Sequence, residues 1–166
     1  MVLAIALLTI SDSRSLGDDP SGDALQQRLK EAGHHLQERA LCPDDRYAIR
    51  AIISRWLADT AVEVVISSGG TGLTGRDGTP EAVEPLLDKT IDGFGELFRV
   101  LSFNSIGTSS LQSRCLAGVA NGTFVFVLPG SRDAVETAWD QLISAQLNAN
   151  TQPCNLAKLL PRLREQ

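Results

Sequence analysis

The sequence predicts an α/β protein of three layers (αβα), with a mainly parallel sheet and helices on both of its faces. Three apolar runs, Val2–Ile10, Val62–Ser67 and Thr123–Leu128, have the composition of strands that are buried on both sides. Amphipathic helical patterns separate these runs, and alternation of strands with helices is typical of parallel sheets. The length suits one hydrophobic core, so we expect residues 1–166 to form a single domain.

A helix and an edge strand are expected after the first buried strand. Ser21 is the candidate N-cap of this helix, which stops at Gly33 and has an apolar face formed by Leu25, Leu29 and Ala32. We interpret Asp18 and Asp19, which precede it, as solvated loop charges. The more polar run His34–Leu41 predicts a strand near the edge of the sheet.

Two more helices are expected around the second buried strand. Asp44 or Asp45 caps the first, whose apolar residues have the spacing of an amphipathic helix and are Ile49, Ile52, Ile53, Trp56 and Leu57. After the strand, Thr79 resembles an N-cap and Pro80 a first helical residue, where proline is well tolerated. This short helix is expected to run to about Leu87.

The second half of the chain has a less regular pattern. A helical stripe follows Gly93 and consists of Phe94, Leu97, Phe98 and Leu101. Ser105–Gly122 has no clear periodicity, and its structure stays open. Pro129-Gly130-Ser131 ends the third strand, and the final helix carries Val135, Ala138, Trp139, Leu142 and Ile143. Residues 148–166 are expected to form a C-terminal tail.

The glycine-rich loop Ser67–Pro80 is the strongest candidate for a functional site. Backbone amides of such a loop form an anion nest, and the following helix start favours an anion. Arg76 can pair with a phosphate through two hydrogen bonds. The loop lacks the lysine of a Walker motif and does not match the dinucleotide-binding pattern. Phosphate binding is therefore predicted, and a loop that serves only as a turn is the alternative.

Asp77 inside this loop points to a bridging metal ion. A carboxylate repels a phosphate unless a cation lies between them, and Mg²⁺ commonly binds one or two carboxylates together with phosphate oxygens. Asp44 or Asp45 is the candidate second carboxylate. Because the carboxyl ends of parallel strands share one edge of a sheet, the loops that contain Ser11–Ser13, Ser67–Thr79 and Gly130-Ser131 are expected to gather there.

Composition excludes several other classes of protein. The net charge of −5 leaves no broad basic surface for nucleic acid. No apolar run has transmembrane length, and the apolar first ten residues are interpreted as a strand and not as a signal peptide. The three cysteines lack the spacing of a zinc site and suit a reducing compartment. We therefore expect a cytoplasmic protein.

An ordered set of strings resembles the MoaB/MogA family of molybdenum cofactor biosynthesis proteins. Each string alone is weak, but together they cover nearly the whole chain in order. They are Thr9-Ile10-Ser11-Asp12-Ser13, Ser21-Gly22, Pro43-Asp44-Asp45, Gly69-Gly70-Thr71-Gly72, Arg76-Asp77, Thr79-Pro80-Glu81, Gly93-Phe94-Gly95-Glu96-Leu97-Phe98-Arg99, Ser113-Arg114 and Pro129-Gly130-Ser131. The strings Gly107-Thr108, Leu111-Gln112-Ser113-Arg114 and Pro153-Cys154-Asn155 look like the MoaB branch.

The resemblance implies a molybdopterin-binding domain that assembles as a homotrimer or homohexamer, with other enzymes of molybdenum cofactor synthesis as candidate partners. It implies Mg²⁺ with ATP as cofactors and adenylylation of molybdopterin as the reaction. Asp77 and Asp44 match the magnesium-linked catalytic positions, with Asp45 as the alternative to Asp44. The ligand-binding residues implied by the loops and the resemblance are Ser11, Asp12, Ser13, Ser68, Gly69, Gly70, Thr71, Gly72, Arg76, Thr79, Pro129, Gly130 and Ser131.

A second function follows from the same resemblance. Some proteins of the MoaB branch do not carry out adenylyl transfer, and Gly78 stands where family members usually have a larger residue. The alternative is therefore a non-catalytic oligomer that binds or carries molybdopterin.

Overall fold

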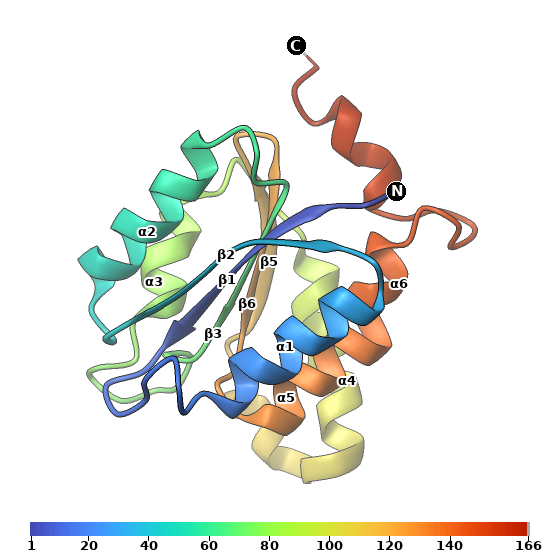
Figure 1. The fold of residues 1–166 in the computed structure, drawn as a ribbon. Coiled ribbons are helices and arrows are strands. Elements are labelled where there is room, and N and C mark those ends of the chain that lie inside the picture. The colour runs from blue at the N-terminus through green and yellow to red at the C-terminus, as the bar shows by residue number, and fades with distance from the viewer. Residues whose placement is uncertain (166) are drawn as a thin grey trace.

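The computed structural model describes residues 1–165 and contains a six-stranded sheet in the order β2-β1-β3-β6-β5-β4 (Figure 1). The strands β2, β1, β3 and β6 are mutually parallel, whereas β5 runs antiparallel to both of its neighbours. The mainly parallel sheet and the edge position of β2 are confirmed. The strands are β1 (Ala4–Ile10), β2 (His35–Cys42), β3 (Val64–Ser68), β4 (Lys89–Thr90), β5 (Leu116–Ala120) and β6 (Thr123–Leu128).

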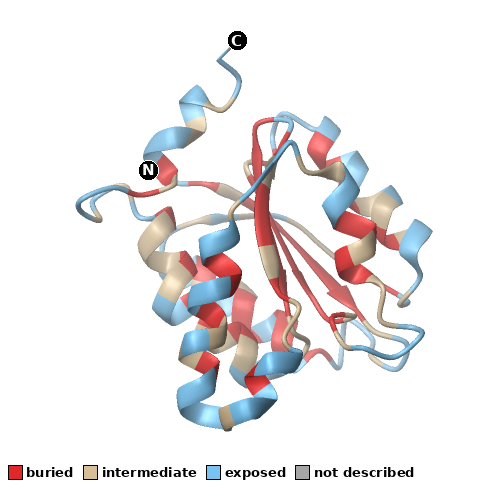
Figure 2. Ribbon diagram, turned by 180° about the vertical axis from the view of Figure 1, so that it is seen from behind, coloured by how far each residue is buried: buried red, intermediate tan, exposed pale blue. Residues whose placement is uncertain are grey.

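Helices cover both faces of the sheet, because alternate side chains of each buried strand point to opposite layers. On β1, Ile5 and Leu7 contact one apolar core, and Ala6 and Leu8 contact the other. The first core is covered by α1 (Pro20–Glu31), α4 (Asp92–Ile106), α5 (Arg132–Ala138) and α6 (Ser144–Leu147). The second is covered by α2 (Arg46–Ala58) and α3 (Thr79–Val83). Figure 2 shows buried residues along the strands and on the inward sides of the helices. The three-layer arrangement is therefore confirmed.

Two helix starts differ from the expectation. Asp19 caps α1, with Pro20 as its first residue, so the assignment of Ser21 as N-cap is wrong. Ser21 Oγ instead donates to the carbonyl oxygen of Gly130 at 2.7 Å. Thr79 is not the N-cap of α3 either, because Gly78 occupies that position and Thr79 is already helical.

Helix α3 is shorter than expected, because Pro85 interrupts its hydrogen bonds. The chain passes at Glu84–Leu86 into a single 3₁₀ turn. Pro85 has no N–H to donate to the carbonyl of Glu81. That carbonyl accepts a hydrogen bond from Arg50 Nη2 at 2.8 Å instead.

The segment that the sequence pattern left open contains the end of α4, a 3₁₀ turn at Gly107–Gln112 and strand β5. Strand β5 is joined to β6 by Asn121 and Gly122, which both have positive φ. Asn-Gly is a strong signal for a two-residue hairpin turn. This dipeptide could therefore have revealed β5 before the structure was known.

Asp19 is buried, so its interpretation as a solvated charge is wrong. Its carboxylate accepts hydrogen bonds from Thr9 Oγ1 at 2.6 Å, from the N–H of Gly22 at 3.1 Å and from Arg39 Nη2 at 2.9 Å. Burial alone would raise the pKa of Asp19, but these hydrogen bonds and the Arg39 charge lower it overall. Asp19 therefore ties the start of α1 to β1 and β2.

We expect Asp19→Asn to destabilise the fold by about 3 kcal/mol, because it leaves the largely buried Arg39 without its buried charged partner. Asp23→Asn is the matched control, since Asp23 also pairs with Arg39 but is mostly exposed, and it should cost less than about 1 kcal/mol. Denaturant unfolding at neutral pH measures both values. Because the pKa of Asp19 is lowered by folding, the difference between wild type and Asp19→Asn should shrink as the pH falls below about 4. Equal losses for the two variants would contradict this role of Asp19.

Candidate functional site

An open cleft of about 520 Å³ lies where the loops after β1, β3 and β6 meet. Figure 1 shows the carboxyl ends of β1 and β3 at the same edge of the sheet, away from both termini. The three loops that were expected to gather do so. The lining residues are Ile10, Ser11, Asp12, Ser13, Arg14, Asp44, Gly69, Gly70, Thr71, Gly72, Asp77, Gly130 and Ser131.

The loops approach so closely at Gly69 that a side chain there is excluded. Gly69 has a φ of 103°, and a Cβ atom on it would lie 2.1 Å from the carbonyl oxygen of Ile10. A Cβ on Gly130 would lie 3.1 Å from the Cα of Gly69. The floor of the cleft is therefore backbone, contributed by the loops that follow three parallel strands.

Four of the residues expected to bind ligand do not line the cleft. Ser68 and Thr79 are buried, and Thr79 Oγ1 donates to the carbonyl oxygen of Gly69 at 2.9 Å. This hydrogen bond supports the loop from beneath. Arg76 and Pro129 also lie outside the lining. Thr79 therefore supports the loop, whereas Arg76 and Pro129 belong to the loops but stay outside the cleft.

Three carboxylates, those of Asp12, Asp44 and Asp77, face the cleft. Burial raises the pKa of Asp44, and the nearby charges of Asp77 and Asp12 raise it further. The N–H of Gly78 donates to Asp44 Oδ1 at 3.2 Å and works in the opposite direction. Asp44 therefore carries its negative charge against the repulsion of two neighbours.

Asp77 is held by its own loop. The backbone N–H and the hydroxyl of Thr74 donate to Asp77 Oδ2 at 2.9 Å and 2.5 Å. These hydrogen bonds, the hydroxyl first, lower the pKa of Asp77. A Cβ on Gly72 would lie 2.5 Å from the same oxygen, so the loop leaves room for this carboxylate only because residue 72 is glycine.

Asp44 and Asp45 have different positions. Asp45 caps α2, because its Oδ1 accepts the N–H groups of Tyr47 and Ala48 at 3.0 Å and 2.8 Å. Asp44 lines the cleft instead. The sequence left both aspartates open as the partner of Asp77, and the geometry favours Asp44.

The oxygen atoms of the cleft suit Mg²⁺ better than a transition metal, since Mg²⁺ prefers carboxylate, phosphate and water oxygens. Among residues 1–165, no group of three or more Cys, His, Asp or Glu side chains is arranged to hold a metal ion by itself. Burial is the main cause of the raised pKa of Asp44, and the repulsion from Asp77 and Asp12 that adds to it is the kind that a divalent cation relieves. Asp44 and Asp77 therefore offer oxygen donors of the kind that a Mg²⁺ ion would take.

Comparison with known proteins identifies the family. Residues 6–149 match a family described as a probable molybdopterin binding domain. The sequence is 54% identical over 151 residues to molybdenum cofactor biosynthesis protein B of Escherichia coli K12, a match that covers 91% of this chain and 89% of the relative. The chain belongs to the MoaB/MogA family.

Solved structures support the same assignment to the MoaB branch. A crystal structure of molybdenum cofactor biosynthesis protein B has a TM-score of 0.90 and 38% identity, over 100% of this chain and 98% of that one. The tungsten cofactor synthesizing protein MoaB from Pyrococcus furiosus has a TM-score of 0.80 and 32% identity, over 99% and 98% of the two chains. Within residues 1–165, no helix has both the length and the apolar character needed to cross a membrane.

Gly78 stands at a position where the sequence resemblance led us to expect a larger residue, and the structure has room for a side chain there. A Cβ at this position would make only ordinary contacts, 3.7 Å from the carbonyl oxygen of Arg76 and 3.9 Å from Asp44 Oδ1. Gly78 uses its backbone N–H to orient Asp44. The bond to Asp44 is therefore available to a larger residue as well.

Arg114 clamps the glycine-rich loop from outside the cleft. Its Nε donates to the carbonyl oxygens of Thr71 and Gly72 at 3.2 Å and 2.9 Å, and its Nη2 donates to that of Asp77 at 3.1 Å. Its Nη1 pairs with Glu81 at the start of α3. Arg114 entered the sequence analysis only as part of a family string, because nothing local reveals a contact 42 residues away in the chain.

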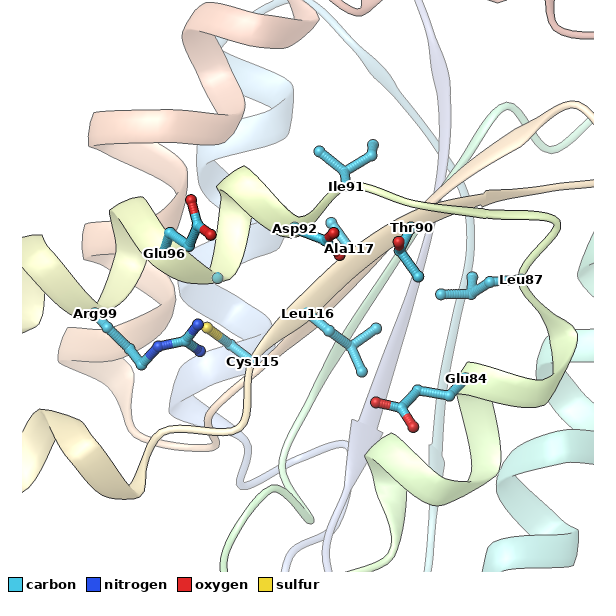
Figure 3. Close-up of a pocket in the computed structure, with 11 residues that line it drawn as sticks. Glu84, Leu87, Thr90, Ile91, Asp92, Glu96, Arg99, Cys115, Leu116 and Ala117 are labelled. Carbon is cyan, nitrogen blue, oxygen red and sulfur yellow. The ribbon is translucent and has the colours of Figure 1, made fainter.

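A second cavity, of about 200 Å³, lies between α4, β5 and the 3₁₀ turn at Glu84–Leu86 (Figure 3). The figure shows the guanidinium of Arg99 pointing toward the sulfur of Cys115. None of the residues that were expected to bind ligand or metal lines this cavity. The candidate chemistry therefore belongs to the cleft at the carboxyl edge.

We expect Arg114→Ala to release the loop around Asp77, because three backbone carbonyls lose a charged donor. Hydrogen exchange of residues 71–78 should become faster, and the free energy of unfolding should fall by about 1–3 kcal/mol. Arg99→Ala is the matched control, since Arg99 makes a single hydrogen bond of 3.4 Å to the carbonyl oxygen of Ser113. Unchanged exchange in the loop of Arg114→Ala would contradict the clamp.

Proposed function

We propose that this protein acts in molybdenum cofactor biosynthesis as a Mg²⁺-dependent molybdopterin adenylyltransferase. The observation that carries the proposal is the position of Asp44 and Asp77 in one cleft with the glycine-rich loop. Membership of the MoaB/MogA family supports the pathway and the pterin ligand. In this proposal residues 1–166 form one molybdopterin-binding domain, and residues 148–166 are its tail. Gln166 lies outside the described residues. The protein is proposed to act in the cytoplasm.

The reaction needs no catalytic base. An oxygen of the terminal phosphate of molybdopterin attacks the α-phosphorus of ATP, the bond from that phosphorus to the bridging oxygen breaks, and pyrophosphate leaves. The attacking phosphate is already an anion at neutral pH, so no proton has to be removed from it. Catalysis therefore depends on alignment and on neutralisation of charge.

The residues of the cleft suit these two tasks. The backbone N–H of Gly70 is the amide of this loop that we assign to a phosphate oxygen, because the N–H of Gly69 already donates to the carbonyl oxygen of Leu128 at 3.0 Å and that of Gly72 donates to Asp77. Asp44 and Asp77 would hold Mg²⁺, which neutralises charge on the phosphate oxygens when it is bound. Ser11, Ser13 and Ser131 add hydroxyl groups at the rim of the cleft.

We expect Asp77→Asn and Asp44→Asn to lower adenylyl transfer by about 100-fold or more, since each removes a carboxylate that would hold the cation. Asparagine keeps an oxygen that can accept the existing backbone hydrogen bonds, so both variants should fold. Asp45→Ser is the matched control, because serine also caps helices and Asp45 does not line the cleft. Formation of adenylylated molybdopterin from ATP, Mg²⁺ and molybdopterin is the measurement.

The same experiment tests the non-catalytic alternative. A folded wild type that binds molybdopterin but forms no adenylylated product would reject the transferase and favour a binding or carrier protein. If the wild type is active and Asp77→Asn is equally active, the proposed metal site is rejected.

A homotrimer or homohexamer is part of the proposal, and the surface of α4 supports it. Four apolar side chains of this helix are exposed in the single chain by 56–62%, namely Leu97, Val100, Phe103 and Ile106. Leu111, in the following 3₁₀ turn, is also exposed. Contiguous apolar side chains on a surface commonly mark protein interfaces.

We expect Phe103→Glu to shift the protein toward smaller species, because a charge would be buried in the interface between copies. Light scattering after size-exclusion chromatography measures the mass. Tyr47→Glu is the matched control, since Tyr47 is an exposed aromatic residue on α2, in the opposite layer. A monomeric wild type, or equal effects of the two changes, would contradict this surface as the interface.

A further inference from the structure

A phosphate group in the cleft needs a positively charged partner, because the carboxylates there are negative. Asp12, Asp44 and Asp77 make the surroundings negative, whereas Arg14 is the one basic residue among those described as lining the cleft. A Mg²⁺ ion at Asp44 and Asp77 would neutralise the phosphate charge of one ligand. A second phosphate group elsewhere in the cleft needs a donor of its own.

Arg14 is held in the cleft by one nitrogen. Its Nη1 donates to Ser21 Oγ at 3.1 Å and to the carbonyl oxygen of Gly130 at 3.2 Å, and it lies 3.6 Å from Asp19 Oδ1. Its backbone N–H donates to Ser11 Oγ at 3.0 Å. Within residues 1–165, Nε and Nη2 of Arg14 have no hydrogen-bond partner. The guanidinium is therefore positioned in advance, with donors still free.

Little of the charge on Arg14 is cancelled by its neighbours. Two of its three contacts are to neutral oxygens, and Asp19 is already paired with Arg39 at the shorter distance of 2.9 Å. The side chain is 32% exposed, so it combines a fixed position with access to the cleft. Such a guanidinium can bind the oxygens of a phosphate through two parallel hydrogen bonds.

The other two arginines near the loop are less suited to this task. Arg76, which the sequence analysis assigned to the phosphate, pairs with Asp12 at 2.8 Å, is 67% exposed and does not line the cleft. Arg114 directs Nε and Nη2 at loop carbonyls and Nη1 at Glu81. Neither therefore offers a positioned and free guanidinium to a ligand in the cleft.

The contacts divide the cleft into an acidic and a basic part. Asp44 and Asp77 lie against Gly70 and Gly72, whereas Arg14 is anchored to Gly130 in the loop after β6. We propose that Arg14 binds the phosphate monoester of the pterin substrate, while the acidic part takes the metal-bound nucleotide. The identity of that monoester as molybdopterin rests on the proposed function.

Binding of two ligands to three proteins tests the assignment. Pterin fluorescence can report the dissociation constants of molybdopterin and of dephosphorylated molybdopterin without ATP or Mg²⁺, for wild type, Arg14→Gln and Arg76→Gln. We expect Arg14→Gln to weaken molybdopterin binding about 10- to 100-fold, the range of a hydrogen bond to a charged group. Dephosphorylated molybdopterin should bind wild type and Arg14→Gln equally, and Arg76→Gln should bind molybdopterin within about threefold of wild type.

The dephosphorylated ligand separates phosphate binding from a structural role. If Arg14→Gln loses affinity for both ligands to the same degree, Arg14 only supports the loops and the assignment is overturned. Unchanged binding of molybdopterin by Arg14→Gln, or no binding by wild type, also overturns it. A phosphate-dependent loss in a protein that forms no adenylylated product would keep the Arg14 assignment and reject the transferase. Arg14→Lys, which keeps the charge without the paired donors, should restore part of the affinity.

Discussion

The cleft depends on the close contact of three backbone segments at Gly69. The carbonyl oxygen of Ile10 occupies the space in which a side chain of residue 69 would lie, and a Cβ on Gly130 would lie 3.1 Å from the Cα of Gly69. This contact is possible because β1, β3 and β6 are adjacent and parallel, so their following loops leave the sheet together. Everything that gives the cleft its chemistry is then added around this contact by the same three loops and by Asp44.

The carboxylates around that contact repel one another, and this repulsion does not favour the folded state. Burial raises the pKa of Asp44, and its position near two other carboxylates raises it further. Arg14 lines the cleft, whereas Arg114 lies outside its lining and donates to backbone carbonyls of the glycine-rich loop. Repulsion between charges in the free protein is common at functional sites, where binding of the ligand relieves it. The buried ion pair of Asp19 and Arg39 holds the neighbouring segment in place.

The sequence predicted the sheet, both helical layers and most of the cleft, because apolar runs and glycines report directly on burial and backbone conformation. It did not predict the cap at Asp19, because a buried aspartate looks like any loop aspartate until its partners are known. Arg14 was overlooked although it follows a buried strand within the loop of Ser11, and a basic residue at that place is a usable signal. Arg114 could not have been found in this way, because its contacts join segments that only the tertiary fold brings together.

The order of the strands has a consequence for synthesis of the chain. In chain order the cleft begins at Ile10 and ends at Ser131, and β6 lies beside β3 although two other strands separate them in sequence. At about 5–20 residues per second, the ribosome needs many seconds to pass from one limit to the other. During that interval β3 has a free edge on one side, and the cleft has no wall from the loop after β6. A ligand that needs the loop after β6 can therefore not assist the folding of the first two thirds of the nascent chain, where β1 pairs with β2 and β3.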